Sequence, residues 1–289
     1  MAASPELERA AHRADARRGV LVGLPAIATL TVLFVVPLFI VLVNSFGTRT
    51  RTGRTDLTTV NVDAYRRLAD PLVIEIAARS IGYALITTAI CLAVGYPFAH
   101  YLASRTARMR ALLLVLVMLP FWSNFLVRTY AWRVLLGSDG PFVAILDALG
   151  LPEVRLLFTP AAVIIGLVYG YLPFMILPLY VAIERIDPLL IESARDLHAS
   201  AFKAFTNVTL PLSRSGIIAG SILVFVPAVG AYVTPELLGG SRSTMLGTYV
   251  VRQFLSARDW PFGSALSVAI LIVMIVATTI YFRTGGKSL

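Results

Sequence analysis

Six long apolar stretches alternate with shorter polar segments along the chain. Each stretch reaches the roughly 20 residues that an α-helix needs to cross a bilayer. The first stretch has no charged residue and exceeds the roughly 7–15 apolar residues of a cleaved secretory signal, so we expect it to be retained. The pattern predicts an all-α integral membrane protein, with a basic cytoplasmic tail over residues 1–19 and one transmembrane domain over residues 20–289. The predicted spans are residues 20–43, 80–104, 111–136, 158–183, 215–235 and 261–282.

Composition agrees with this class, because 57% of the residues are apolar and only 14% are charged, whereas soluble domains average about 25% charged residues. The net charge of +9 does not indicate a nucleic-acid partner, since no basic face lies outside the spans. Lysine and arginine are denser in the segments assigned to one side, as expected for cytoplasmic loops. Six spans then place both termini in the cytoplasm. The loops expected outside are residues 44–79, 137–157 and 236–260.

The polar segment between spans four and five, residues 184–214, is amphipathic. Asp187 can cap a helix that starts at Pro188, a residue that has no backbone N–H to satisfy. Ser200 can cap a second short helix, which Pro211 should end. The apolar side of the first helix would consist of Leu190 or Ile191, Ala194 and Leu197. Two short helices between membrane spans predict a docking surface for a soluble protein.

This segment also carries a motif, made of Glu192-Ser193-Ala194, Leu197-His198-Ala199, Leu210-Pro211 and Gly216-Ile217. It resembles the EAA loop of ABC-importer permeases. The resemblance implies a coupling helix that sits in a groove of a cytoplasmic ATPase. The residues expected to make that contact are Glu192, Ser193, Ala194, Asp196, Leu197 and His198. Ser193 replaces the usual alanine, and His198 replaces the usual glycine, at a cost on the order of 1 kcal/mol if the turn requires positive φ.

The stretch LPFWSNFLVRTYAW, residues 119–132, has two interpretations. Tryptophan and tyrosine gather at membrane interfaces, and an arginine can extend to the headgroups from there. Alternatively, the aromatic faces line a solute path, where they can hold a cation. The residues of such a path would be Trp122, Asn124, Tyr130 and Trp132. Arg128 would repel a cation, which favours a structural or gating role for this side chain.

Residues 119–132, 158–180 and 258–266 together resemble the polyamine branch of these permeases, specifically the first membrane subunit of spermidine/putrescine importers. The likeness extends over residues 63–282. It implies the type I (MetI-like) permease fold in a bacterial cytoplasmic membrane. It also implies a second homologous permease, two copies of a cytoplasmic ABC ATPase and an extracytoplasmic solute-binding protein as partners, besides membrane lipid. Permeases for other small organic solutes share much of these stretches and remain an alternative.

No catalytic residue, cofactor or metal site is expected. Gly286-Lys287-Ser288 imitates the end of a phosphate-binding loop, but Tyr281 stands where that loop needs glycine, so ATP hydrolysis is assigned to a separate subunit. The predicted span cores contain no Asp or Glu, which argues against an ion-coupled carrier. The three histidines are scattered and metal-ligand spacings are missing. A membrane-embedded enzyme would need clustered acids or histidines and is the less favoured alternative.

Overall fold

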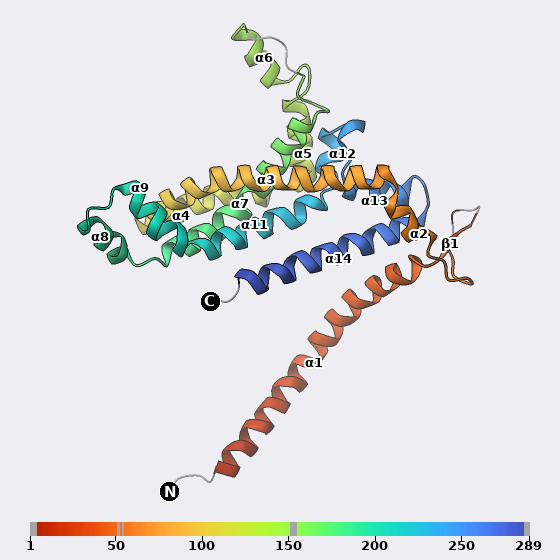
Figure 1. Cartoon of the computed structure of the whole chain (residues 1–289), viewed down its shortest axis with the longest axis horizontal. Helices are drawn as coiled ribbons and strands as arrows, with labels where there is room; N and C mark the ends of the chain where they lie inside the picture. The colour runs from red at the N-terminus through yellow and green to blue at the C-terminus, as the bar shows by residue number, and fades with distance from the viewer. Residues whose placement is uncertain (1–4, 51–52, 54, 151–154, 286–289) are drawn as a thin grey trace.

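The computed structural model describes residues 5–285, except residues 51–52, 54 and 151–154, and its described residues are mostly helical (Figure 1). The short strands β1 and β2 pair antiparallel, with Thr48 opposite Asp56. In chain order the elements are α1 (Pro5–Asn44), β1 (Thr48–Arg49), β2 (Thr55–Asp56), α2 (Asp63–Arg66), η1 (Arg67–Ala69), α3 (Pro71–Ala103), α4 (Ala107–Met118), η2 (Leu119–Trp122), α5 (Phe125–Leu135), α6 (Pro141–Ala148), α7 (Pro160–Glu184), α8 (Pro188–Asp196), α9 (Ala201–Ala204), the π-helical turn η3 (Phe205–Thr209), α10 (Leu210–Leu212), α11 (Arg214–Val229), α12 (Val233–Leu238), η4 (Ser241–Ser243), α13 (Leu246–Leu255) and α14 (Trp260–Gly285).

Helices α3, α7 and α11 pack against one another and form the centre of the molecule (Figure 1). The starts of α3 and α7 are encoded locally. The Asp70 carboxylate accepts a backbone N–H at 2.9 Å just before Pro71, and the Thr159 hydroxyl accepts one at 3.3 Å just before Pro160. Such caps satisfy donors that the first helical turn leaves free, and proline there adds no further donor.

Glycines allow the central helices to approach closely. A Cβ atom at Gly216 of α11 would lie 2.5 Å from the Ala182 Cβ and 2.6 Å from the Pro178 carbonyl oxygen of α7. A Cβ atom at Gly220 would lie 2.7 Å from the sulfur of Met175, which is fully buried. Small residues at helix contacts are the usual means of association in lipid, where van der Waals packing replaces the hydrophobic effect.

All six predicted apolar stretches lie in helical segments, but the third is broken at residues 123–124 and the fifth at residues 230–232. By length and composition, α1 from Gly23 onward, α3 and α7 can each cross a membrane as single helices. Two bent pairs pass the same test: α4–η2 with α5, at an angle of 89°, and α9–α10 with α11, at 64°. Helix α14 adds an apolar stretch over Trp260–Val276. The prediction of an all-helical membrane protein is therefore confirmed.

The helices differ in their bounds from the predicted spans. Helix α3 begins at Pro71, before the predicted second span at residue 80, because Asp70 caps it there. The stretch predicted as a span over residues 111–136 is interrupted between Trp122 and Phe125. The side-chain oxygen of Asn124 accepts two backbone N–H groups there, at 2.8 and 3.4 Å, and so starts α5 as a new helix. Helix α11 ends at Val229, before the predicted end of the fifth span at residue 235.

A half-buried ion pair ties the segment after the β1–β2 hairpin to the start of α14. Arg67 donates to the Asp259 carboxylate at 2.7 Å, and its guanidinium lies 3.9 Å from the ring centre of Phe262. The Asp259 side chain is only 5% exposed, and it also accepts the Phe262 backbone N–H at 3.2 Å. The short helices α2 and η1 precede Asp70, and this ion pair fixes them to the bundle.

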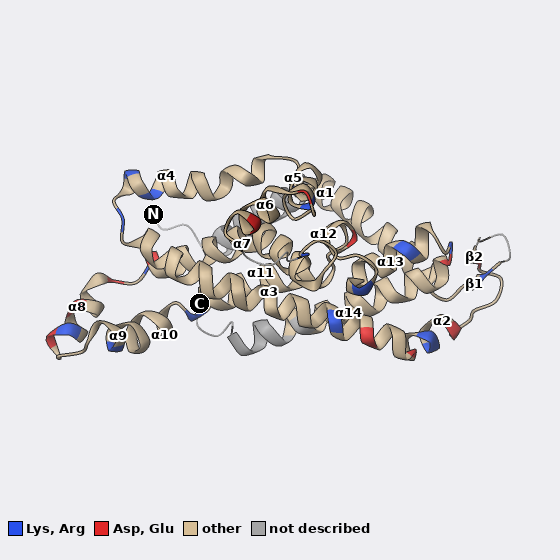
Figure 2. Ribbon diagram, turned by 90° about the horizontal axis from the view of Figure 1, so that it is seen from above, with Lys and Arg blue, Asp and Glu red and all other residues tan. Residues whose placement is uncertain are grey.

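Charged side chains gather at the two ends of the bundle (Figure 2). One end carries α8, α9 and the first turn of α4, and the other carries α2 and α13 (Figures 1 and 2). The first end of α1 and the last end of α14 both point toward the side that carries α8 and α9 (Figure 1). Long apolar helices with charge at both ends are the arrangement expected of a membrane-crossing bundle.

We expect Gly216→Ala to destabilise the protein, because the added methyl group would collide with backbone and side-chain atoms of α7. Overpacking of this kind costs about 1–3 kcal/mol. Gly82→Ala in α3 is the matched control, since a Cβ atom there would meet nothing within 4 Å. Thermal unfolding of the detergent-solubilised protein should show a lower Tm for Gly216→Ala and an unchanged or higher Tm for Gly82→Ala. Equal Tm values for the two variants would contradict the close packing.

Candidate functional site

The polar loop between α7 and α11 folds as the sequence predicts. The Asp187 carboxylate accepts a backbone N–H at 3.0 Å and starts α8 at Pro188. The Ser200 hydroxyl accepts the Lys203 backbone N–H at 3.3 Å and starts α9. The second helix passes through the π-helical turn η3 and ends at Leu212, one residue after the proline expected to end it. Helix α8 and the start of α9 thus project from one end of the bundle (Figure 1).

The end of α8 is a left-handed turn centred on His198, whose φ is 62°. The backbone N–H of His198 donates to the Arg195 carbonyl at 2.9 Å, and that of Ala199 donates to the Ala194 carbonyl at 3.1 Å. These two bonds define a Schellman motif, in which glycine is the preferred residue at the position that His198 occupies. The histidine therefore keeps the turn geometry of glycine and carries the steric cost of its Cβ atom.

The side chains of α8 divide into an inward and an outward set. Ile191 and Ala194 are half-buried against the following segment, so Ile191 rather than Leu190 belongs to the inner side. The prediction that Leu197 shares this inner side was wrong: it is 83% exposed because it caps the helix, where the chain turns away. Phe202 on α9 is 74% exposed. The other residues assigned to the ATPase contact are exposed as well: Glu192, Ser193, Asp196 and His198.

Buried contacts join this loop to the central helices. The hydroxyls of Tyr96 on α3 and Ser213 share a hydrogen bond of 2.7 Å, at the point where α10 and α11 meet at 64°. The Tyr96 ring also packs edge-on against Phe205 of η3, at 5.5 Å between ring centres. Nearby, Arg110 of α4 pairs with Glu184 at the end of α7, at 2.6 Å. The loop is therefore anchored to three spans.

The four residues proposed for a solute path do not lie together. Trp122 is 81% exposed and Tyr130 is 51% exposed, whereas Trp132 turns inward and packs against Tyr169 of α7, at 5.3 Å between ring centres. Asn124 holds the break between η2 and α5, a local role that the residue type alone did not reveal. Trp122 and Tyr130 are thus exposed, whereas Trp132 lines an internal cavity.

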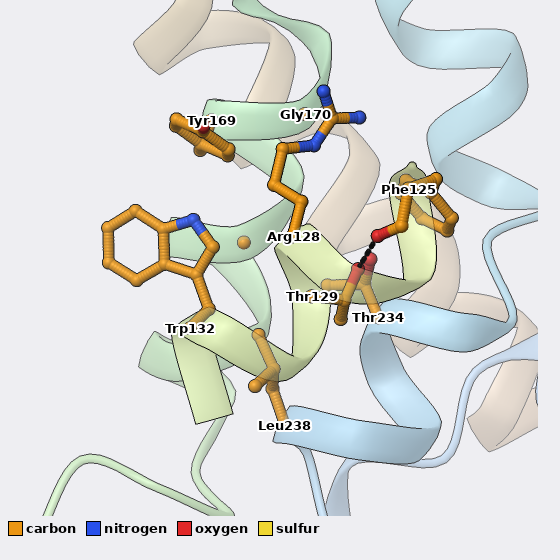
Figure 3. A pocket seen from close by; sticks show the side chains of 9 residues that line it. Phe125, Arg128, Thr129, Trp132, Tyr169, Gly170, Thr234 and Leu238 are labelled. Carbon is orange, nitrogen blue, oxygen red and sulfur yellow. Dashed lines mark hydrogen bonds between the residues drawn. The ribbon is translucent and has the colours of Figure 1, made fainter. Parts of the chain in front are cut away.

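Arg128 occupies the cavity that Trp132 borders, between α5, α7 and α12 (Figure 3). Its guanidinium donates to the Pro120 carbonyl oxygen at 2.8 Å. The rings of Phe121, Phe125 and Tyr169 surround it, at 4.8, 5.7 and 5.7 Å from the guanidinium carbon to the ring centres. Arg128 forms no ion pair with any carboxylate of the described residues. Sequence reasoning gave this arginine a structural or gating role but did not identify the rings that hold it.

A larger cavity, of about 340 Å³, opens at the other end of the bundle between α3 and α13. Arg79 and Arg252 line it, and each pairs with a carboxylate: Arg79 with Glu75, and Arg252 with Glu236 at 3.0 Å. Tyr249 also lines it, and partial burial raises the pKa of this phenol above its ordinary value. Here the described residues offer polar groups for a protein or a solute that approaches from this end.

The described residues contain no cluster of three or more histidine, cysteine or acidic side chains that could hold a metal ion. Cys91 is buried. The features that stand out are therefore the exposed loop at one end, the two cavities, and the broken helices between them.

Comparison with known proteins agrees with this description. Residues 95–284 match the family described as "Binding-protein-dependent transport system inner membrane component". The spermidine/putrescine transport system permease protein PotB of Escherichia coli is 44% identical over 257 residues, which cover 88% of this chain and 93% of that protein. PotB of Haemophilus influenzae is 44% identical over 228 residues, 78% of this chain and 80% of that protein.

A solved structure has a similar fold. It is a bacterial alginate ABC transporter in complex with an alginate pentasaccharide-bound periplasmic protein, with a TM-score of 0.71, 18% identity, and coverage of 93% of this chain and 95% of that chain. The family match and the relatives above place the protein among multi-pass permease subunits of the inner membrane rather than among enzymes. The chain belongs to the family of inner membrane components of binding-protein-dependent transport systems.

Proposed function

We propose that this chain is a permease subunit of an ATP-driven importer for polyamines such as spermidine and putrescine. The observation that carries the proposal is the 44% identity to PotB over 88% of the chain. In this function the chain pairs with a second, homologous permease, and solute delivered by an extracytoplasmic binding protein passes between the two. Two copies of a cytoplasmic ATPase supply the energy.

The exposed loop built from α8 and α9 supports the assignment of an ATPase contact. A carboxylate, Glu192, and the large apolar side chains Leu197 and Phe202 are all exposed on this loop. Exposed apolar groups with a charge are suited to a groove on a soluble partner, because the apolar groups bury area and the charge fixes orientation. The Tyr96–Ser213 hydrogen bond connects the end of this loop to α3, so a movement of the loop would be felt by that helix.

Both termini are placed in the cytoplasm in this proposal. The first end of α1 and the last end of α14 point toward the end that carries α8 (Figure 1), and arginine and lysine are denser in the sequence segments assigned to that side. Positive residues favour the cytoplasmic side. The hairpin, α2 and α13 then face outward, where the cavity between α3 and α13 can meet the binding protein.

Cysteine labelling tests this orientation. In a Cys91→Ala background, Val60→Cys should react with a membrane-impermeant thiol reagent added outside, because Val60 is 84% exposed beyond the end of α1. Leu197→Cys, which is exposed to a similar degree, should react only after the membrane is breached. The reverse pattern of labelling would contradict the orientation.

Substitutions in the loop test the ATPase contact. Glu192→Lys and Leu197→Asp should insert into the membrane normally but bind the ATPase at least tenfold more weakly, because the loss of a desolvated charge contact costs about 2 kcal/mol or more. Pull-down of the ATPase and solute uptake in vesicles measure the effect. Ala194→Trp is a less specific probe, since Ala194 packs inside the loop.

Two controls belong to this experiment. Asp139→Lys reverses an exposed charge in a segment assigned to the outer side and should leave ATPase binding unchanged. His198→Gly restores the residue preferred in the left-handed turn and should be tolerated. Wild-type ATPase binding and uptake in both Glu192→Lys and Leu197→Asp would show that the loop is not the coupling element.

Uptake assays test the solute and its path. If exposed aromatics of α5 and η2 contact the cation, Trp122→Ala or Tyr130→Ala should slow spermidine uptake severalfold while ATP hydrolysis continues, since a desolvated cation–π contact contributes about 2 kcal/mol. Val127→Ala, at an apolar position of α5 that is 66% exposed, is the control. Unchanged uptake in both aromatic variants would return them to a role at the membrane interface. An intact complex that moves another solute and no polyamine would disprove the polyamine assignment.

A further inference from the structure

The site around Arg128 has the components of a binding site for an organic cation. Three aromatic rings lie within the roughly 6 Å at which a ring face attracts a positive charge. A carbonyl oxygen, that of Pro120, completes the site as a hydrogen-bond acceptor. No carboxylate of the described residues pairs with the guanidinium. The site therefore holds its cation without a permanent counter-charge.

The break between η2 and α5 creates this site. The Pro120 carbonyl lies in the last turn of η2, where it accepts the Ser123 backbone N–H at 3.3 Å and the Ser123 hydroxyl at 2.6 Å in addition to the Arg128 guanidinium. The chain turns by 89° between η2 and α5, and this turn brings the Arg128 side chain within hydrogen-bonding distance of the Pro120 carbonyl. Phe121 and Phe125 flank the break, and Tyr169 reaches the same point from α7 (Figure 3).

Arg128 nearly fills its site. Gly170 of α7 lies beside Arg128 (Figure 3), and a Cβ atom there would meet no other atom within 4 Å. The cavity left beside the arginine is only about 10 Å³, so an ammonium group could enter the site only when the arginine side chain moves out. The arginine side chain is long and only half-buried, so it can leave the rings without unfolding α5.

We propose that the rings of Phe121, Phe125 and Tyr169, with the Pro120 carbonyl, form a cation site on the solute path that Arg128 and an ammonium group of the solute occupy in turn. The proposal rests on the proposed function, since it needs a cationic solute. Two positive charges held in the same partly desolvated site would repel strongly. The guanidinium and the ammonium group therefore exclude each other. Arg128 then acts as a tethered competitor that keeps the site closed until solute displaces it.

Equilibrium binding of radiolabelled spermidine to the whole importer complex in lipid nanodiscs, without the binding protein, tests this exchange. Arg128→Gln removes the competitor and should bind spermidine roughly tenfold more tightly than wild type, the scale of one cation–π contact. Adding Tyr169→Leu to Arg128→Gln should abolish the gain. Methylguanidinium should compete with spermidine for the Arg128→Gln complex, because the site accepts both cations.

Arg133→Gln is the matched control. It removes one positive charge from the same helix, and the Arg133 guanidinium lies beside a single ring, that of Phe158, at 5.9 Å. Its spermidine binding should equal that of wild type. If Arg128→Gln binds spermidine no better than Arg133→Gln and only lowers Tm, Arg128 only stabilises the break between η2 and α5. The exchange proposal is then wrong.

Two further results separate the possible failures. Should Arg128→Gln not assemble, Tyr169→Leu alone leaves the Arg128–Pro120 hydrogen bond in place and should still reduce spermidine uptake; unchanged uptake overturns the proposal. Wild-type uptake of spermidine is measured alongside. If the wild-type complex takes up spermidine while the cation site fails its test, the polyamine function stands. If it takes up no polyamine, both proposals fall.

Discussion

The close approach of α7 and α11 is the constraint on which the rest of the structure depends. In lipid, apolar side chains gain little by leaving the solvent for a protein interior, so helices associate through close van der Waals contact. Gly216 and Gly220 provide this contact by bringing α11 against the backbone of α7. Once these helices are fixed, the end of α7 and the start of α11 define where the exposed loop must begin and end.

Polar side chains enter the helical bundle mainly at two breaks, one before α5 and one before α11. A continuous helix satisfies all of its interior backbone groups, and each break in a membrane protein requires substitutes. At the first break, the Asn124 side-chain oxygen accepts backbone N–H groups at the start of α5, and Arg128 donates to the Pro120 carbonyl. At the second, Ser213 bonds both to the Leu210 carbonyl and to Tyr96. Polar side chains are therefore concentrated where the helices turn.

Sequence reasoning succeeded where the signal is local. The caps at Asp187 and Ser200 depend on a few consecutive residues, and the structure contains both. The sequence left the turn at His198 open, and the structure shows that it is left-handed. The break before α5 was missed because hydrophobicity continues through it and only the Asn124 cap marks it. The cluster around Arg128 could not be predicted, since Tyr169 joins it from a helix far along the chain, and only after α5 has turned.

The position of the loop relative to the bundle bears on how ATP-driven motion could reach a solute. A flexible loop would absorb a displacement of α8, because its own backbone would bend first. Here Ile191 and Ala194 pack against the segment that follows, and Phe205 of η3 packs on Tyr96 of α3. The Tyr96–Ser213 hydrogen bond is buried, so separating the two hydroxyls would leave polar atoms without water. These contacts join α8 and its following segment to both α3 and α11, so a displacement of the loop would strain packing in two central helices at once.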